Sequence, residues 1–454
     1  MEKFSWECRT RVRSGYGCVK EYLPALVREF AQPDKNIMIG YGGGSVKKNG
    51  SYDDVMEVLT ELGYSICCNE SDAENDAETA CKDNAATDNI TNAAGERKDD
   101  AATGSKGSKA AADSKGNKII EFSGIMSNPT LAKMREGAKL AAESNVGLII
   151  AIGGGSVMDC CKAVSVQAAY DGDAWQDFWM AGKPMTHDII PCGVVVTMPA
   201  TGSEVNGCAV LTNEETRIKC DRDYPEMNPA FALLDPEYTL TMPLRQLRAG
   251  TFDILSHVME TYFSYPVEDN PADDISEGLM RGLIRDFRAA VKDPQDVHAR
   301  SNILWAASLA ENRIIKTGKT KDFQAHNMEH QLSAYTDCNH GEGLAVLHPV
   351  YYRHIYKDGL GKFVRFAERV WGLSAEKLSS TEKLSREEKL ALAGIEKLAD
   401  FIKEMGLPTT LRELGFGETE KALLPEIADS CFISQGAFRP LDAAEILEIY
   451  EECW

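Results

Sequence analysis

The sequence predicts an α/β N-terminal domain built on a parallel sheet, followed by an all-α C-terminal domain. Up to about residue 236, short apolar stretches alternate with helical periodicity, which is typical of a parallel sheet covered on both faces. Beyond that point helical periodicity dominates and strand signals largely vanish. A chain of 454 residues is also too long for one compact core. We therefore expect two domains, 1–237 and 238–454, with a boundary near Pro236 to Pro243.

Each strand expected in the first domain is a short run of mostly apolar residues. These runs are 36–41, 63–67, 118–122, 146–152 and 189–198. Amphipathic or helical patterns separate them at 52–62, at 130–144 and through Cys161 to Ala168. This alternation of strand and helix predicts a sheet of parallel strands with helices on its two faces.

The segment 69–117 differs from the rest of the chain in composition. It consists mainly of Ala, Asp, Asn, Lys, Gly and Ser, and Ile90 is almost its only large apolar residue. Such a segment cannot bury enough apolar surface to offset its chain entropy. We expect a disordered insertion whose deletion leaves folding and activity nearly intact, and we expect that a few residues could join the strands on either side.

The second domain shows a series of helical patterns. They cover 247–263, 275–291, 301–316, 323–335, 387–405 and 443–453.

Charge and composition exclude several classes of partner. The net charge of −21 argues against binding to nucleic acid or to a membrane surface. No run reaches the roughly 18 apolar residues of a transmembrane helix, and the N-terminus lacks the apolar core of a signal peptide. The 13 cysteines form no CxxC motif, and their odd number suits reduced thiols. We expect a cytoplasmic protein.

Five residues in two short stretches are candidates for a metal site. Asp253 and His257 are four residues apart, as are His326 and His330, so each pair shares one face of a helix. His340 follows closely. A carboxylate with imidazoles is a typical ligand set for a divalent first-row metal. Each pair alone could equally be a surface or capping pair, and spacing does not choose between His326 and His330.

Two Gly-Gly-Gly-Ser turns, at 42–45 and 153–156, each follow an expected strand and precede a helix. Glycines let a backbone approach a ligand closely, and a helix N-terminus attracts phosphate. Either turn could also be a tight connection without a ligand. Neither has GxGxxG spacing or ends in Gly-Lys-Ser/Thr, which disfavours an ordinary Rossmann fingerprint and a P-loop. Asp159 either complements the helix dipole or binds a ribose or amide of the ligand.

Taken together, these motifs resemble those of the iron-containing (group III) alcohol dehydrogenases, and within them the butanol dehydrogenase-like, NADPH-dependent branch. The stretches that carry the resemblance are Gly42–Lys48, Gly153–Asp159, Met198–Glu204, Phe252–His257, His326–His330 and His340-Gly341. The resemblance spans nearly the whole chain except 69–117. It implies a dehydroquinate synthase-like architecture, with a Rossmann-like parallel sheet and a helical metal-binding domain.

The resemblance also assigns roles to individual residues. The metal ligands it implies are Asp253, His257, His326 and His340. It leaves His330 as an active-site residue between metal, substrate and nicotinamide, with a structural histidine as the alternative. The implied cofactor-binding residues are Gly42, Gly43, Ser45, Gly154, Gly155, Asp159, Thr197, Thr201, Asn206 and Lys219. The alternative for Lys219 is a solvated surface lysine.

The expected cofactors are NADP(H) and a divalent metal. Glycines at 42–44, with Ser45, Lys47 and Lys48 nearby, leave room and positive charge for a 2′-phosphate, whereas NAD(H) is the alternative. The ligand set suits Fe(II), which family habit favours, as well as Zn(II), Mn(II) or Ni(II).

The expected reaction is reversible hydride transfer between a short-chain alcohol and its aldehyde, such as butanol and butyraldehyde. The rival hypotheses are a polyol or hydroxy-acid dehydrogenase of the same superfamily and a catalytically inactive NADPH-binding protein. We expect a small-molecule substrate and a homo-oligomer.

Overall fold

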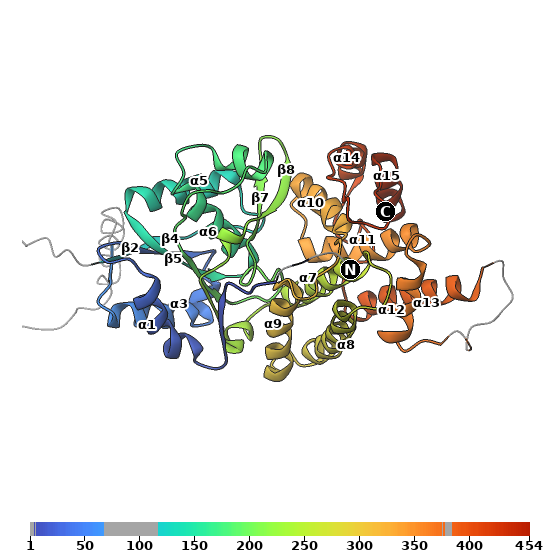
Figure 1. Ribbon diagram of the computed structural model, residues 1–454, viewed down its shortest axis with the longest axis horizontal. Helices are drawn as coiled ribbons and strands as arrows, with labels where there is room; N and C mark the ends of the chain where they lie inside the picture. Colours follow the sequence, from blue (N-terminus) through green and yellow to red (C-terminus); the bar gives the residue numbers. More distant parts are fainter. Residues whose placement is uncertain (1–3, 5, 68–116, 375, 377–383) are drawn as a thin grey trace, which may run out of the picture.

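The computed structural model describes residues 4, 6–67, 117–374, 376 and 384–454 (Figure 1). Apart from Asn117, the segment 69–117, which we expected to be a disordered insertion, lies outside the described residues.

Seven parallel strands form the sheet of the first domain. In chain order they are β1 (Arg11–Ser14), β2 (Asn36–Tyr41), β3 (Ser65–Ile66), β4 (Lys118–Phe122), β5 (Val146–Gly153), β6 (Cys192–Val196) and β9 (Phe231–Leu234). Their order across the sheet is β1-β9-β6-β5-β2-β4-β3. Every neighbouring pair is parallel, as β2 and β5 illustrate with Ile39 beside Ile150. The predicted parallel sheet is confirmed.

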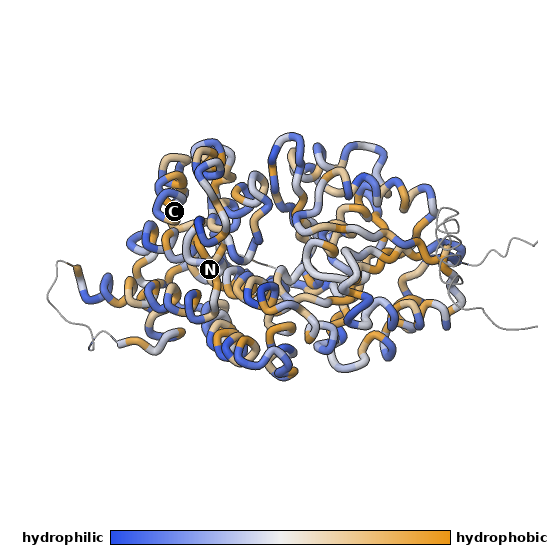
Figure 2. Tube along the Cα trace, turned by 180° about the vertical axis from the view of Figure 1, so that it is seen from behind, coloured by the Kyte–Doolittle hydropathy of each residue, from blue (hydrophilic) through white to orange (hydrophobic). Residues whose placement is uncertain are grey.

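Helices cover both faces of this sheet (Figure 1). The helices α1 (Cys18–Phe30) and α3 (Ser51–Glu61) lie on one face, with the short α2 (Ser45–Lys48) before α3. The helices α5 (Leu131–Glu143) and α6 (Gly155–Gln167) lie on the other. Successive β5 side chains point to opposite cores, so Leu148 and Ile150 pack with α1 and α3, whereas Ile149 and Ala151 pack with α5 and α6. Figure 2 shows hydrophobic stretches running through the middle of this domain.

One expectation about β3 and β4 is wrong. The two strands are parallel neighbours, with Ser65 beside Lys118. Parallel neighbours need a crossover connection of about a dozen residues or more, so a few residues could not join them.

An antiparallel hairpin in the first domain was not predicted. Its strands are β7 (Cys208–Asn213) and β8 (Ile218–Asp223). A π-helical turn, η1 (Trp175–Met180), contacts β8. The hairpin stands beside α10 (Gln324–Thr336) of the helical domain and brings Lys219 toward it (Figure 1).

The rest of the chain is helical, as predicted. Two 3₁₀ turns, η2 (Pro225–Met227) and η3 (Pro236–Thr239), flank β9. The helices that follow are α7 (Leu244–Tyr262), α8 (Pro271–Lys292), α9 (Val297–Glu311), α10 (Gln324–Thr336), α11 (His340–Ile355), α12 (Leu360–Arg369), α13 (Arg386–Glu404), α14 (Glu418–Asp429) and α15 (Ala443–Glu452). Of these, α11, α12 and α14 were not predicted. None of the described helices is both long and apolar enough to cross a membrane.

Candidate metal centre and cofactor cleft

Three helices of the second domain bring four of the predicted residues to one point. Asp253 and His257 come from α7, His326 from α10 and His340 from the first turn of α11. The Oδ1 atom of Asp253 lies 3.6 Å from Nδ1 of His257, 3.5 Å from Nε2 of His326 and 3.6 Å from Nε2 of His340. Residues up to 87 positions apart thus present one carboxylate and three imidazole nitrogens to a common centre.

Three of these atoms are buried without a hydrogen-bond partner among the described residues: Asp253 Oδ1, His257 Nδ1 and His326 Nε2. Unsatisfied buried polar atoms are costly and rare. Their separations suit ligands that each lie about 2 Å from one shared ion. Burial raises the pKa of Asp253, but the imidazoles of His257, His340 and His326 outweigh burial and hold the pKa below its ordinary value. The site therefore fits a divalent metal.

Two buried glutamates, neither of which was among the predicted site residues, orient two of these histidines. Glu260 contacts Nδ1 of His326, and its other oxygen accepts a 2.7 Å hydrogen bond from the Ala325 amide. Glu329 contacts Nδ1 of His340. With Nδ1–H donated to a carboxylate, each ring directs its Nε2 toward Asp253. Glu260 follows Asp253 by seven residues and therefore lies on the same helical face. This spacing could have indicated its role beside the metal site.

His330 lies beside this centre. Its ring is 5.4 Å from that of His340 between centroids, and His330, His340 and Glu329 could themselves form a second group of ligands. The contact of Glu329 with Nδ1 of His340 instead assigns that carboxylate an orienting role. Burial, together with Lys219 and nearby imidazoles, lowers the pKa of His330 well below its ordinary value, which favours a neutral ring.

Lys219 on β8 is buried, so the alternative of a solvated surface lysine is wrong. Its ammonium group donates to Asn128 Oδ1 at 2.9 Å and to Ser333 Oγ at 2.7 Å, and it lies 3.7 Å from Glu329. The hairpin thus places a fixed positive charge next to the centre.

A cleft of about 450 Å³ extends from this centre to the carboxyl ends of the strands. Its walls include these predicted residues: Gly154, Gly155, Asp159, Thr201, Lys219, Asp253, His330 and His340. A Cβ on Gly155 would lie 2.4 Å from Cγ2 of Thr201, so only glycine permits this approach. Ligands bind at this edge in open α/β sheets, and the cleft is large enough for part of a dinucleotide.

The remaining predicted cofactor residues lie at or near the same edge. Gly42 and Gly43 directly follow β2, and Gly42 accepts a hydrogen bond from Gly124, next to Ile125 of the cleft wall. Ser45 begins α2 and is exposed. Thr197 follows β6 and donates its amide to Gly153. The structure therefore brings both glycine turns to one side of the sheet.

Asp159 and Asn206 take part in a buried network around Lys162, which was not among the predicted site residues. Asp159 accepts from Ser203 Oγ at 2.5 Å and from the Val210 amide at 3.0 Å. Lys162 donates to Ser203 Oγ and to the Asn206 carbonyl. Both Asp159 oxygens thus have partners within the protein. The network joins α6 to the segment that leads into β7.

A second cavity, of about 340 Å³, lies beside the histidines and is lined by residues of both domains. It shares His330 and His340 with the cleft and is also lined by His257, His326 and Phe323. A small molecule there would lie next to three of the candidate metal ligands, His257, His326 and His340.

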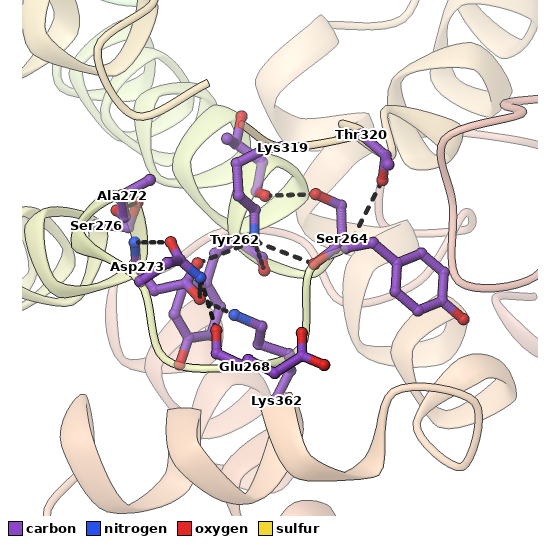
Figure 3. Close-up of polar contacts among 12 residues, drawn as sticks. Tyr262, Ser264, Glu268, Ala272, Asp273, Ser276, Lys319, Thr320 and Lys362 are labelled. Atoms are coloured by element: carbon purple, nitrogen blue, oxygen red, sulfur yellow. Dashed lines mark hydrogen bonds and ion pairs between the residues drawn. The ribbon is translucent and has the colours of Figure 1, made fainter. Parts of the chain in front are cut away.

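A buried ionic cluster fixes the ends of two of the helices that carry the site. Figure 3 shows Asp273 of α8 between Lys319 and Lys362. Lys319, in the segment before α10, donates to the carbonyls of Tyr262 and Ser264 at the end of α7. The cluster therefore connects the C-terminus of α7 with the approach to α10.

Comparison with protein families gives two matches that together cover most of the chain. Residues 102–236 match the model described as iron-containing alcohol dehydrogenase. Residues 248–454 match that of the C-terminal part of the Fe-containing alcohol dehydrogenase family.

Individual relatives match over their full length. NADH-dependent butanol dehydrogenase A of Clostridium acetobutylicum is 32% identical, with 100% of both chains covered. NADPH-dependent aldehyde reductase YqhD of Escherichia coli is 30% identical, with 99% of each covered. The crystal structure of NADH-dependent butanol dehydrogenase A from Thermotoga maritima superposes with a TM-score of 0.79 at 27% identity, covering 100% of this chain and 99% of that one. The chain belongs to the iron-containing alcohol dehydrogenase family and is an oxidoreductase of that family.

Proposed function

We propose that this protein is a metal-dependent, NAD(P)-linked dehydrogenase that interconverts short-chain aldehydes and alcohols. The observation that carries the proposal is the set of unpartnered ligand atoms of Asp253, His257 and His326, placed between a nucleotide-sized cleft and a smaller cavity. Such an arrangement allows a substrate oxygen and a nicotinamide to meet at one point.

The side chains of Asp253, His257, His326 and His340 would hold the metal, with Fe(II) as the first choice and Zn(II) as the alternative. When bound, the metal supplies a Lewis acid for the substrate oxygen. Asp253, His257 and His326 are buried, which limits the access of water to the site, whereas His340 is half-buried.

The glycine turns would hold NADP(H), and Lys219 would add positive charge near the centre. Relatives of both cofactor types exist, since one is named NADH-dependent and another NADPH-dependent. An added side chain on Gly43 would meet open space, and Lys47 lies on the following helix. Room and positive charge at the end of β2 favour the 2′-phosphate of NADPH.

His330 lines both cavities, so it can exchange a proton with the substrate oxygen. An imidazole at this place can relay the proton that is released when an alcohol is oxidised and taken up when an aldehyde is reduced. When bound, the nicotinamide would supply a hydride to the aldehyde carbon or accept one from the alcohol carbon.

The decisive assay is oxidation of NADPH by metal-replete protein in the presence of butyraldehyde, methylglyoxal or lactaldehyde, with glycerol and NADP tested in the reverse direction. We expect aldehyde reduction that a chelator abolishes. No turnover with any of these compounds would favour a catalytically inactive nucleotide-binding protein. A rate confined to glycerol would favour the polyol dehydrogenase.

We also propose a cytoplasmic location and a homo-oligomer. Every cysteine in the described part of the chain is free, which suits a reducing compartment. Sedimentation at micromolar concentration tests the assembly, and a monomer would contradict it.

A further inference from the structure

Glu311, the last residue of α9, has one carboxylate oxygen without a partner. The residue is 4% exposed and lines the smaller cavity together with His257 and His326. Its Oε2 atom accepts from Lys316 Nζ at 2.6 Å and from Asn206 Nδ2 at 3.2 Å. Its Oε1 atom is buried and has no hydrogen-bond partner among the described residues.

This oxygen requires a hydrogen-bond donor from the cavity. Burial raises the pKa of Glu311, but Lys316 and His257 outweigh it and hold the pKa below its ordinary value. An ionised carboxylate only accepts hydrogen bonds, and leaving such an oxygen dry and unpaired is costly. Because Lys316 already balances its charge, a neutral donor is sufficient.

We propose that Glu311 accepts a hydrogen bond from a hydroxyl group of the substrate, so that hydroxylated aldehydes and diols are preferred to their unsubstituted counterparts. This inference rests on the proposed function and names the substrate class of the same site. Glu311 is then a specificity-determining residue that lines the same cavity as the candidate metal ligands His257, His326 and His340.

The walls of the cavity favour this class over two others. An unbranched alkyl chain would leave Glu311 Oε1 unpaired and shielded from water. A carboxylate on the substrate would be repelled, because the carboxylates of Asp221, Asp223 and Glu311 in the described lining outnumber the ammonium groups of Lys316 and Lys321. A neutral hydroxyl avoids both costs.

A matched substrate series tests the proposal on the metal-replete full chain. Propionaldehyde, lactaldehyde and glyceraldehyde have three carbons and carry no, one and two hydroxyl groups. Butyraldehyde and succinic semialdehyde both have four carbons, and comparing them shows the effect of a carboxylate on the substrate. We expect kcat/KM to be at least about tenfold higher for one hydroxylated aldehyde than for propionaldehyde, as a hydrogen bond to a charged group implies.

The variant Glu311→Leu removes the acceptor. We expect the ratio of kcat/KM for the hydroxylated to the unsubstituted aldehyde to fall at least about tenfold. Glu311→Gln keeps the shape, and since a neutral hydrogen bond is weaker than a charged one, it should give an intermediate ratio. Glu311→Gln also tests the proposal if Glu311→Leu does not fold. Glu448→Leu, at an exposed position of α15, is the matched control and should keep the wild-type ratio.

The outcomes are distinct. Reduction of all the aldehydes with the same ratio in wild type, Glu311→Leu and Glu311→Gln would overturn this inference but leave the proposed function standing. A preference for succinic semialdehyde over butyraldehyde would also overturn it. No reduction of any aldehyde by the metal-replete protein would contradict the proposed function and this inference with it.

Discussion

Glu260 on α7 contacts Nδ1 of His326 on α10, and its other oxygen accepts a hydrogen bond from the Ala325 amide. One buried carboxylate thus fixes both the ring and the backbone at the start of α10. Because Asp253 and His257 lie on the same face of α7, this contact sets the position of His326 relative to them.

Replacing Glu260 by glutamine should therefore weaken metal binding. The amide keeps the shape but removes the negative charge that holds the proton on Nδ1 of His326. We expect a 10- to 100-fold loss of metal affinity, roughly the usual effect of such outer partners, measured by competition with a chromophoric chelator. Glu448→Gln on the surface of α15 is the control. Equal affinities in the two variants would refute the role of Glu260.

Gly341 lets α11 approach α7 next to His340. A Cβ at this position would lie 2.1 Å from the carbonyl oxygen of Ala249. Gly341→Ala should displace the start of α11, lowering the free energy of unfolding by about 1–3 kcal/mol and weakening metal binding through His340. Gly282→Ala on α8 is the control, because open space surrounds that position; there alanine should stabilise by about 0.5–1 kcal/mol. Similar denaturation midpoints for both variants would contradict the close approach.

Cofactor preference should respond to charge at Gly43. The position follows β2, and an added side chain meets no atom within 4 Å. Gly43→Asp should lower kcat/KM for NADPH at least about tenfold more than for NADH, because the carboxylate repels a 2′-phosphate. Steady-state kinetics with both nucleotides measure this. An equal loss for both would show that the 2′-phosphate lies elsewhere, and a strong NADH preference of the wild type would oppose the NADP(H) proposal.

The cluster around Asp273 should make stability depend on pH. Burial, reinforced by Arg365, lowers the pKa of Lys319 and of Lys362 to about 7, whereas an unfolded lysine keeps a pKa near 10.5. Between these values the unfolded chain binds more protons, so the free energy of unfolding contributed by these lysines rises with pH from about 7 to about 10 and is lost as pH falls to 7.

Lys362→Met should reduce this dependence, since it leaves one lysine for one carboxylate. Denaturant unfolding at about pH 7 and about pH 10 measures the slope, with Lys403→Met on the exposed side of α13 as the control. Parallel pH profiles for wild type and Lys362→Met would show that Lys362 does not titrate in this range.

Much of the fold could be predicted because it follows from local pattern. The buried strands β2 and β5 are continuous apolar runs, and Asp253 and His257 share a helical face through their spacing alone. The hairpin β7–β8 was missed because both strands are short and β8 carries four charged residues. Strand order, and with it the parallel neighbours β3 and β4, depends on contacts between distant segments.

The candidate site was predictable in its residue types but not in its surroundings. Motifs indicated His326 and His340, yet the orienting contacts of Glu260 and Glu329 depend on how α7, α10 and α11 pack. The unpaired oxygen of Glu311 is likewise a property of the assembled cavity. No spacing rule relates position 311 to position 257.

The most direct test of the account is a metal titration of the chelator-treated protein, following bound metal and aldehyde-dependent NADPH oxidation together. For the wild type we predict activity that rises in proportion to bound Fe(II) and saturates at about one ion per chain, as a single set of four ligands implies. Asp253→Asn should bind the ion at least about 100-fold more weakly and recover no activity at the same concentration. Full activity of the wild type without metal, or full recovery of activity by Asp253→Asn, would contradict a metal site at Asp253, His257, His326 and His340.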